Sequence, residues 1–265
     1  MIGLGTYSFF WQWHESAQRP LSWRGMLDKT REWGLNLFQF CDYPLLDSIS
    51  VSEMSEIARY ADSRDIKLEL GTRGLDQKHL EHYLALCETT GSQILRSMIL
   101  PHQVEVAVSL LQNVLPALER TGVKLSLETY EQVRVGKLIE IVRTLSSEHI
   151  GICLDPANSV AALDMPDMTI PECAPFVNNV HVKDFSFSRR DGWIGFTYAG
   201  SKLGEGLLDY PAIHSVAKSA GRESNRIIEH WLVWQGDHPT TAAMEDEWTL
   251  HSIDYLNNYK EVIKK

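Results

Sequence analysis

The chain has 265 residues, of which 44% are hydrophobic and 23% charged, as is ordinary for a globular enzyme. Its formal net charge of −10 and the lack of any basic run argue against nucleic acid as a partner. The sequence starts directly on a strand pattern without a leader, its four cysteines are scattered, and no stretch reaches the ~18 apolar residues that span a bilayer. We therefore expect a cytoplasmic protein with free thiols and no membrane contact.

Short β-rich runs alternate with amphipathic helical patterns along the whole chain, which predicts βα units and a parallel sheet. The predicted strands cover residues 2–8, 35–41, 66–71, 93–99, 122–128, 150–155, 178–184 and 225–231. One helix is predicted to end at residue 33, and the others cover residues 50–64, 76–91, 102–121, 133–147, 170–176, 210–220 and 242–262. Glycines at positions 34, 91, 122 and 221 stand where helical patterns stop, as helix C-termini favour. Strands and helices in this alternation, with no linker between them, predict one (β/α)8 TIM barrel of the α/β class, a single domain over residues 1–265.

Each of the last four predicted strands ends in a residue that can bind a metal ion. Successive side chains of a strand point to opposite faces, and in each of these strands apolar residues alternate with small or polar ones. The residues with the inward parity at the carboxyl ends are Glu128, Asp155, His181 and Glu229. Because the carboxyl ends of barrel strands meet at one rim, we expect these four side chains to form a metal site.

The separation between His181 and Glu229 is nearly twice that between the earlier ligands. The excess lies in residues 184–208, a stretch rich in glycine and aromatic residues at the carboxyl end of the seventh strand. Loops of this length without regular structure are usually lids or binding loops. The residues that could close over a polar substrate are Lys183, Arg189, Arg190, Trp193 and Phe196. A surface loop or an oligomer contact is the alternative.

Three carboxylates and one imidazole form a hard, mostly oxygen donor set. We expect it to bind one divalent ion, with Mn²⁺ first, and with Mg²⁺, Co²⁺ or Zn²⁺ as alternatives. Structural zinc sites, in contrast, are rich in cysteine. Any one of the four residues alone would be weak evidence, since a lone histidine at a strand end is more often a hydrogen-bonded core residue.

Several short motifs occur in an order that resembles a known superfamily. They are Leu127-Glu128, Cys153-Leu-Asp155-Pro-Ala-Asn158, Val180-His181-Val-Lys-Asp184, Leu203-Gly-Glu-Gly206 and Ile228-Glu229-His. In these motifs the chain resembles the xylose isomerase-like barrels, the sugar phosphate isomerase/epimerase proteins, which are related to endonuclease IV. The resemblance extends over essentially the whole chain. It implies a divalent ion held by the four residues above and a small sugar or oxidised sugar as substrate.

In the ketose epimerases of this group, two glutamates also act on opposite faces of the substrate while the metal stabilises an enediolate. Glu128 and Glu229 match these positions and are the predicted catalytic residues. Glu131 competes with Glu128 for the first position, but it falls past the end of the strand. The leading interpretation is therefore a metal-dependent sugar isomerase or epimerase that acts by proton transfer.

Two departures from the epimerase pattern support an alternative. Asn158 stands where ketose 3-epimerases usually carry a histidine, and Lys183-Asp184-Phe185 replaces a segment with an arginine. Together with the loop that contains Arg190, these residues look closer to branches that decarboxylate a 3-oxo sugar acid, such as 3-oxo-isoapionate, or eliminate from a 3-keto glycoside. Lys183 or Arg190 would then bind a substrate carboxylate. A metal-dependent decarboxylase or lyase is thus the second interpretation.

Four further residues stand near the expected site, and two of them have a structural alternative. Trp13 could stack on a sugar ring or pack in the core, and Trp231 could form a wall of the pocket. Arg96 has the inward parity in its strand and could bind substrate or form a buried salt bridge. Glu69 could contact a ligand residue or the substrate.

Two expectations concern partners. We expect a homo-oligomer, a dimer or a tetramer. Nucleic-acid repair in the manner of endonuclease IV is the third interpretation. It would need additional His and Asp ligands and a basic groove, and the charge of −10 disfavours it.

Overall fold

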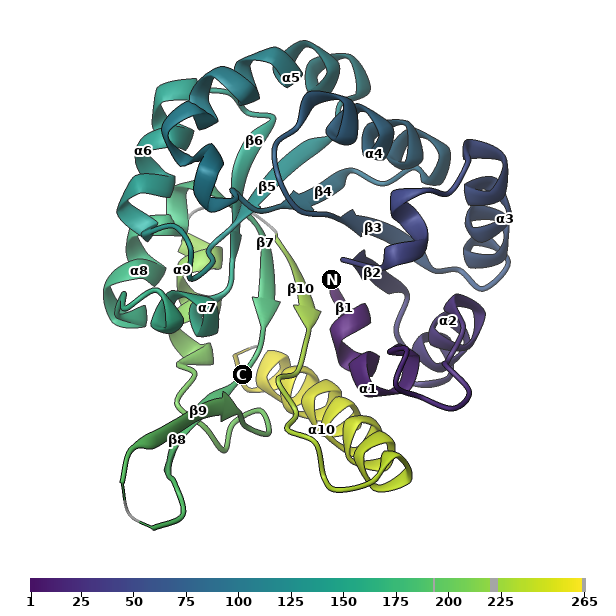
Figure 1. The fold of residues 1–265 in the computed structure, drawn as a ribbon, viewed down its shortest axis with the longest axis vertical. Helices are drawn as coiled ribbons and strands as arrows, with labels where there is room; N and C mark the ends of the chain where they lie inside the picture. The colour runs from purple at the N-terminus through teal and green to yellow at the C-terminus, as the bar shows by residue number, and fades with distance from the viewer. Residues whose placement is uncertain (193, 220–223, 264–265) are drawn as a thin grey trace.

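The computed structural model describes residues 1–192, 194–219 and 224–263, and its strands form a closed parallel barrel surrounded by helices (Figure 1). The order of strands around the barrel is β1-β10-β7-β6-β5-β4-β3-β2. Their bounds are β1 Ile2–Gly5, β2 Leu37–Cys41, β3 Lys67–Gly71, β4 Ile94–Ser97, β5 Lys124–Glu128, β6 Ile150–Leu154, β7 Val177–Val182 and β10 Asn225–Ile228. The predicted (β/α)8 barrel is confirmed.

Helices follow the barrel strands on the outside of the sheet (Figure 1). Their bounds are α1 Phe10–Trp13, α2 Trp23–Glu32, α3 Val51–Asp62, α4 Gln77–Thr90, α5 Ala107–Thr121, α6 Val135–Leu145, α7 Pro156–Ala161, α8 Pro166–Cys173, α9 Tyr210–Ser219 and α10 His238–Ile263. Short 3-10 turns cover Thr6–Phe9, Pro44–Asp47, Pro101–Val106 and Ala174–Phe176. Gly34, Gly91 and Gly122 have φ values of 80°, 68° and 71°, so three of the predicted glycine helix ends are left-handed as expected, and Gly221 lies outside the described residues.

Two helical predictions need correction. The helix predicted over residues 170–176 begins earlier, at Pro166, and α7 was not predicted at all. Both helices start with proline at the first position, where its fixed φ suits a helix and its missing N–H costs nothing.

The alternation of side chains in the strands separates the apolar core from a polar interior. The outward residues of β5 and β6, such as Leu125 and Ile152, join the buried hydrophobic cluster with residues of α6 such as Leu138. On the inner side, the Ser126 hydroxyl donates a hydrogen bond to Asn178 Oδ1. The predicted inward parity of the ligand-bearing strands is therefore confirmed, although β10 ends at Ile228 and places Glu229 just beyond it.

Residues 184–208 are not the unstructured loop that the sequence suggested. β8 (Phe185–Arg189) and β9 (Phe196–Gly200) pair as an antiparallel hairpin that projects from the barrel (Figure 1). The Asp184 carboxylate holds the returning chain, since it accepts hydrogen bonds from the backbone N–H groups of Gly204, Gly206 and Leu208 at 2.8, 3.1 and 2.9 Å. A Cβ at Gly206 would lie 2.2 Å from Asp184 Oδ1, so only glycine fits there. Trp193, predicted to lie over the substrate, is outside the described residues.

None of the helices described here combines the length and the apolar character that crossing a bilayer requires.

Candidate metal centre

The four predicted ligands meet at the carboxyl ends of β5, β6, β7 and β10. One potential ligand atom from each of Glu128, Asp155, His181 and Glu229 lies within 4.8 Å of the others. All four side chains are buried, with exposed fractions of 3%, 0%, 0% and 2%. Glu131, the competitor of Glu128, is exposed. The structure therefore brings together the four residues that the sequence predicted, and leaves the competitor outside.

His181 turns one ring nitrogen toward the three carboxylates. Nδ1 lies 3.2 Å from Glu128 Oε1, 3.3 Å from Glu229 Oε2 and 3.9 Å from Asp155 Oδ2. The other ring nitrogen, Nε2, lies 2.8 Å from Gln39 Oε1 on β2. A cation bound among the carboxylates would therefore take Nδ1 as its nitrogen ligand.

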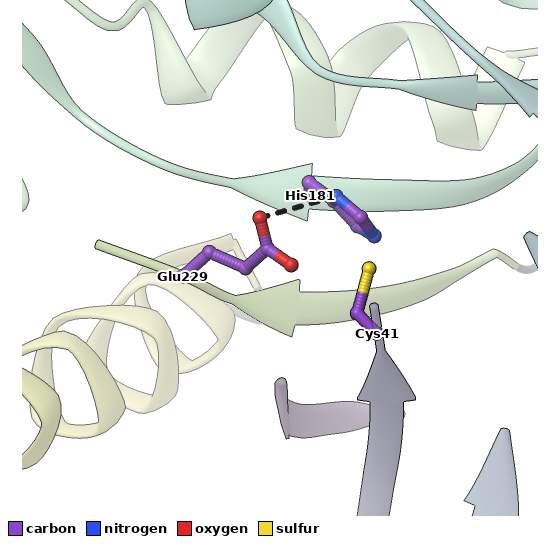
Figure 2. Close-up of side chains that lie close together, drawn as sticks. All are labelled: Cys41, His181 and Glu229. Atoms are coloured by element: carbon purple, nitrogen blue, oxygen red, sulfur yellow. Dashed lines mark ion pairs between the residues drawn. The ribbon is translucent and has the colours of Figure 1, made fainter. Parts of the chain in front are cut away.

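A second group that could hold a cation shares two of these residues and adds Cys41, at the end of β2 (Figure 2). Burial raises the pKa of the Cys41 thiol well above its ordinary range, which keeps it protonated. Because the thiolate is the form that binds metals, Cys41 is the poorer ligand. The group with three carboxylates is the better candidate.

The donor set fits a divalent cation. Among the described atoms, three buried carboxylate oxygens have no hydrogen-bond partner: Glu128 Oε2, Asp155 Oδ2 and Glu229 Oε1. The first two lie beside the charged groups of Arg96 and Lys183, respectively. Buried oxygens in this state are costly unless an ion or donor satisfies them. Oxygen-rich sets of this kind suit Mg²⁺ or Mn²⁺.

Two buried cations already compensate the carboxylates. Lys183 Nζ lies 2.8 Å from Asp155 Oδ2 and 3.1 Å from Glu229 Oε2, and the Arg96 guanidinium pairs with Glu128. Lys183 and Arg96 are only 4% and 2% exposed. Asn158, at the start of α7, donates a hydrogen bond of 2.9 Å to Glu128 Oε1. The carboxylates are therefore oriented from several sides before any ion binds.

These contacts shift the pKa values of the cluster. Burial opposes ionisation of both glutamates, but Arg96 and His181 lower the pKa of Glu128, and His181 and Lys183 lower that of Glu229. Burial raises the pKa of Asp155 against the opposing effect of Lys183. Burial would lower the pKa of Lys183, yet the neighbouring carboxylates raise it well above its ordinary value. Lys183 is therefore a protonated ammonium group beside ionised glutamates.

The imidazole of His181 also gains a proton. Burial disfavours its charged form, but Cys153, Glu229 and Glu128 outweigh this effect and raise its pKa well above the usual range. Because only a neutral imidazole binds a metal, cation binding would release this proton.

Asp42, which follows β2, was not predicted as a site residue from the sequence. Its carboxylate lies 2.9 Å from Arg96 Nη1 and 3.0 Å from Arg73 Nη2, and it accepts a hydrogen bond of 3.3 Å from the Tyr7 hydroxyl. Asp42 has a positive φ of 52°, a backbone conformation that non-glycine residues adopt mainly where the surroundings hold them in it. Its position directly after a strand was the one signal that the sequence offered.

Of the predicted substrate-binding residues, the structure brings four to the cluster and leaves two apart. Lys183, Arg96 and Asn158 contact the predicted ligands, and the Trp231 ring lies over Lys183 with 4.6 Å between Nζ and the ring centroid. Arg190 is exposed at the end of the hairpin, with no described contact to the cluster. Trp13 packs edge-on against Tyr43 and donates from Nε1 to Thr6 O at 2.8 Å, which is the packing alternative.

Comparisons with known proteins place the chain among related barrels. The family described as xylose isomerase-like TIM barrel matches residues 27–259. The 3-oxo-isoapionate decarboxylase of Pectobacterium atrosepticum is 44% identical over 260 residues, which cover 96% of this chain and 94% of the relative.

Two solved structures share the fold. A xylose isomerase-like TIM barrel protein from Mycobacterium smegmatis in complex with magnesium superposes with a TM-score of 0.68 at 16% identity, covering 86% of this chain and 88% of the other. D-psicose 3-epimerase with D-tagatose from Clostridium cellulolyticum H10 gives 0.72 at 13% identity, covering 96% and 97%.

Proposed function

This chain belongs to the xylose isomerase-like TIM barrel family, and we propose that within it the protein is a metal-dependent decarboxylase of a 3-oxo sugar acid. The relative named 3-oxo-isoapionate decarboxylase, which aligns along almost the full chain, supports this choice over the isomerase or epimerase that the sequence analysis put first. The epimerase comparison, at 13% identity, concerns the fold alone.

One observation in the site carries the proposal: the buried ammonium group of Lys183 lies between two carboxylates. Lys183 Nζ is 2.8 Å from Asp155 and 3.1 Å from Glu229. Both glutamates have lowered pKa values, which makes them good cation ligands and weak general bases. Loss of carbon dioxide requires no base at all, whereas isomerisation begins with removal of a proton.

The reaction can be balanced with the residues present. The bond between the substrate carboxylate and its neighbouring carbon breaks, carbon dioxide leaves, and the electron pair moves toward the 3-oxo group. A bound divalent cation would polarise that 3-oxo group and stabilise the charge that develops on its oxygen. The carbon that lost the carboxylate then takes one proton, for which Lys183 Nζ is the donor in the site. Solvent returns the proton to the lysine.

The remaining residues of the site hold the reacting groups in place. Asn158 and Arg96 fix the two oxygens of Glu128, and the Trp231 ring covers Lys183 and limits its contact with water. Tyr198 of β9 packs edge-on against Trp231, with 5.5 Å between ring centroids, so the hairpin supports this wall.

The charge of the site favours an anionic substrate. With His181 neutral, as a metal ligand must be, the carboxylates of the site outnumber its cations by one, and a divalent ion would reverse the sign of the net charge. The carboxylates are Asp42, Glu128, Asp155 and Glu229, and the cations are Arg73, Arg96 and Lys183. A net positive site attracts a sugar acid more strongly than a neutral ketose.

The test is to incubate Mg²⁺- or Mn²⁺-loaded protein with 3-oxo sugar acids in D₂O. We expect carbon dioxide release and one deuterium at the carbon that lost the carboxylate. A ketohexose in a parallel reaction should show neither. Deuterium exchange into the ketose without carbon loss, together with no carbon dioxide from the acids, would instead establish the isomerase reading and refute this one.

A further inference from the structure

A hydrogen-bonded network of buried polar side chains lies beneath the candidate ligands, inside the barrel. Gln39 on β2 and Glu69 on β3 are 0% and 3% exposed, and Asn179 on β7 is 0% exposed. Gln39 Nε2 donates to Glu69 Oε2 at 3.0 Å, and Asn179 Nδ2 donates to the same oxygen at 2.9 Å. Asn225 Nδ2 donates to the other oxygen, Glu69 Oε1. Glu69 does not touch any of the four candidate ligands in these contacts.

The directions of the hydrogen bonds from Gln39 to its two neighbours in this network follow from Glu69. Both oxygens of Glu69 accept hydrogen bonds from side-chain amides, and the side of Gln39 that faces them is its NH₂ group. The opposite side of the same amide is then the carbonyl oxygen, which faces His181 Nε2 at 2.8 Å. An amide oxygen also only accepts, so His181 must keep its hydrogen on Nε2.

We propose that Glu69 and Gln39 are positioning residues that make Nδ1 of His181 the metal-binding nitrogen. With the hydrogen fixed on Nε2, the nitrogen that is left to bind a cation is Nδ1. That nitrogen is the one that lies 3.2 Å from Glu128 and 3.3 Å from Glu229. This inference rests on the metal site of the proposed function, but not on the identity of the substrate.

The two residues act at different distances from the ion. Gln39 contacts His181 directly, whereas Glu69 acts through Gln39. A glutamine at position 69 could offer NH₂ to Gln39, which would allow the Gln39 amide to turn over and donate to Nε2. The histidine would then carry its hydrogen on Nδ1, pointing into the carboxylates, and could not bind the ion.

The experiment measures Mg²⁺ and Mn²⁺ binding by titration calorimetry and by the electron paramagnetic resonance of free Mn²⁺. Partners that orient a metal-binding histidine are typically worth 10- to 100-fold in affinity. We expect Glu69→Gln and Gln39→Met each to weaken binding by about 10- to 100-fold. Ser126→Ala is the matched control. It removes a buried hydrogen bond to Asn178 inside the same barrel and leaves the network of Glu69, Gln39 and His181 intact. It should lower Tm and leave the metal Kd unchanged.

Exchanging the two residues provides a rescue. In the double variant Gln39→Glu with Glu69→Gln, a carboxylate faces His181 Nε2 and a glutamine amide faces that carboxylate. The pattern again presents an acceptor to Nε2, and the formal charge is the same as in the parent chain. We expect the double variant to recover most of the affinity that Glu69→Gln loses. The ¹⁵N spectrum of the Mg²⁺-saturated parent and double variant should show the His181 hydrogen on Nε2.

Several outcomes would overturn the inference. One is unchanged metal affinity in folded Glu69→Gln, and another is a double variant that binds no better than Glu69→Gln. An Nδ1–H signal in the Mg²⁺-saturated parent protein would have the same meaning. None of these measurements uses a substrate, so a failed decarboxylation assay would refute the proposed reaction and leave this inference standing, and the reverse also holds.

Discussion

Replacing Lys183 by methionine should change metal binding and turnover in opposite directions. The substitution keeps the length of the side chain and removes its charge. In the parent protein the ammonium group is 4% exposed and pairs with Asp155 at 2.8 Å and with Glu229 at 3.1 Å. Without it, two buried carboxylates lose their cation.

The size of the effect follows from this burial. Removing one partner of a buried ion pair typically costs about 3–5 kcal/mol, because the other partner stays buried and uncompensated. We therefore expect metal-free Lys183→Met to be less stable by that amount. A divalent cation would compensate the same carboxylates, so part of the loss returns on binding. Each recovered 1.4 kcal/mol tightens the metal Kd about tenfold, while loss of the proton donor should lower kcat by about 10²- to 10⁴-fold.

The assay compares urea unfolding with and without Mg²⁺, the metal Kd by calorimetry, and the rate of carbon dioxide release. Lys29→Met is the matched control. Lys29 pairs with Asp246 at 2.6 Å on the outside of the barrel, and the two side chains are 26% and 34% exposed. A pair of that exposure contributes about 1 kcal/mol at most. The control should therefore lose little stability, and its metal Kd and turnover should match those of the parent.

If Lys183→Met bound metal no more tightly than the parent and kept its turnover, the reasoning would be refuted on both points. Tighter metal binding with full turnover would leave Lys183 as a counterion and exclude it as the proton donor.

Three further predictions concern the ligands, the ion and the acid stability. Glu128→Gln and Glu229→Gln should each abolish measurable turnover and weaken metal binding in calorimetry, and wild-type activity in either folded variant would contradict the assignment. EDTA should inactivate the protein, and Mn²⁺ or Mg²⁺ should restore carbon dioxide release; activity that survives complete metal removal, checked by elemental analysis, would contradict a metal-dependent reaction. Burial lowers the pKa of His230 from 6.5 to about 4, so below pH 6.5 the unfolded chain takes up a proton that the folded one does not. Stability should therefore fall by about 3 kcal/mol between about pH 6.5 and pH 4, and His230→Asn should flatten that part of the profile in urea titrations; an unchanged slope in the variant would assign the acid sensitivity to other groups.

The convergence of the four candidate ligands could be predicted from the sequence because two local rules place them. The period of two in a strand assigns Glu128 and His181 to the inner face, and the parallel order of βα units brings the carboxyl ends of their strands to one rim. Neither rule requires knowledge of which strands are neighbours. The same alternation, applied to the second strand, gives Gln39 the inward parity, but parity alone does not distinguish a filler of the barrel interior from a partner of His181.

Asp42 and the hairpin show where local rules stop. The role of Asp42 depends on Arg73, just beyond β3, on Arg96 of β4, and on a positive φ that no pattern of neighbouring residues predicts. The stretch 184–208 has the glycine content of an irregular loop. Its order comes from one carboxylate, Asp184, which binds backbone groups about twenty residues further along the chain. Contacts of this range are decided in three dimensions.

Arg96 and Lys183 explain how so many buried carboxylates are compatible with a folded barrel before any metal ion binds. A buried charge without a partner costs several kcal/mol, and here Arg96 serves Glu128 and Asp42 while Lys183 serves Asp155 and Glu229. A divalent ion would add two positive charges to carboxylates that these side chains already balance in large part, so the site would then carry surplus positive charge. That positive charge would attract the carboxylate of a sugar acid, whereas it would not attract a neutral ketose. The ability to fold without the metal and the proposed preference for an anionic substrate would therefore be two consequences of the same pair of side chains.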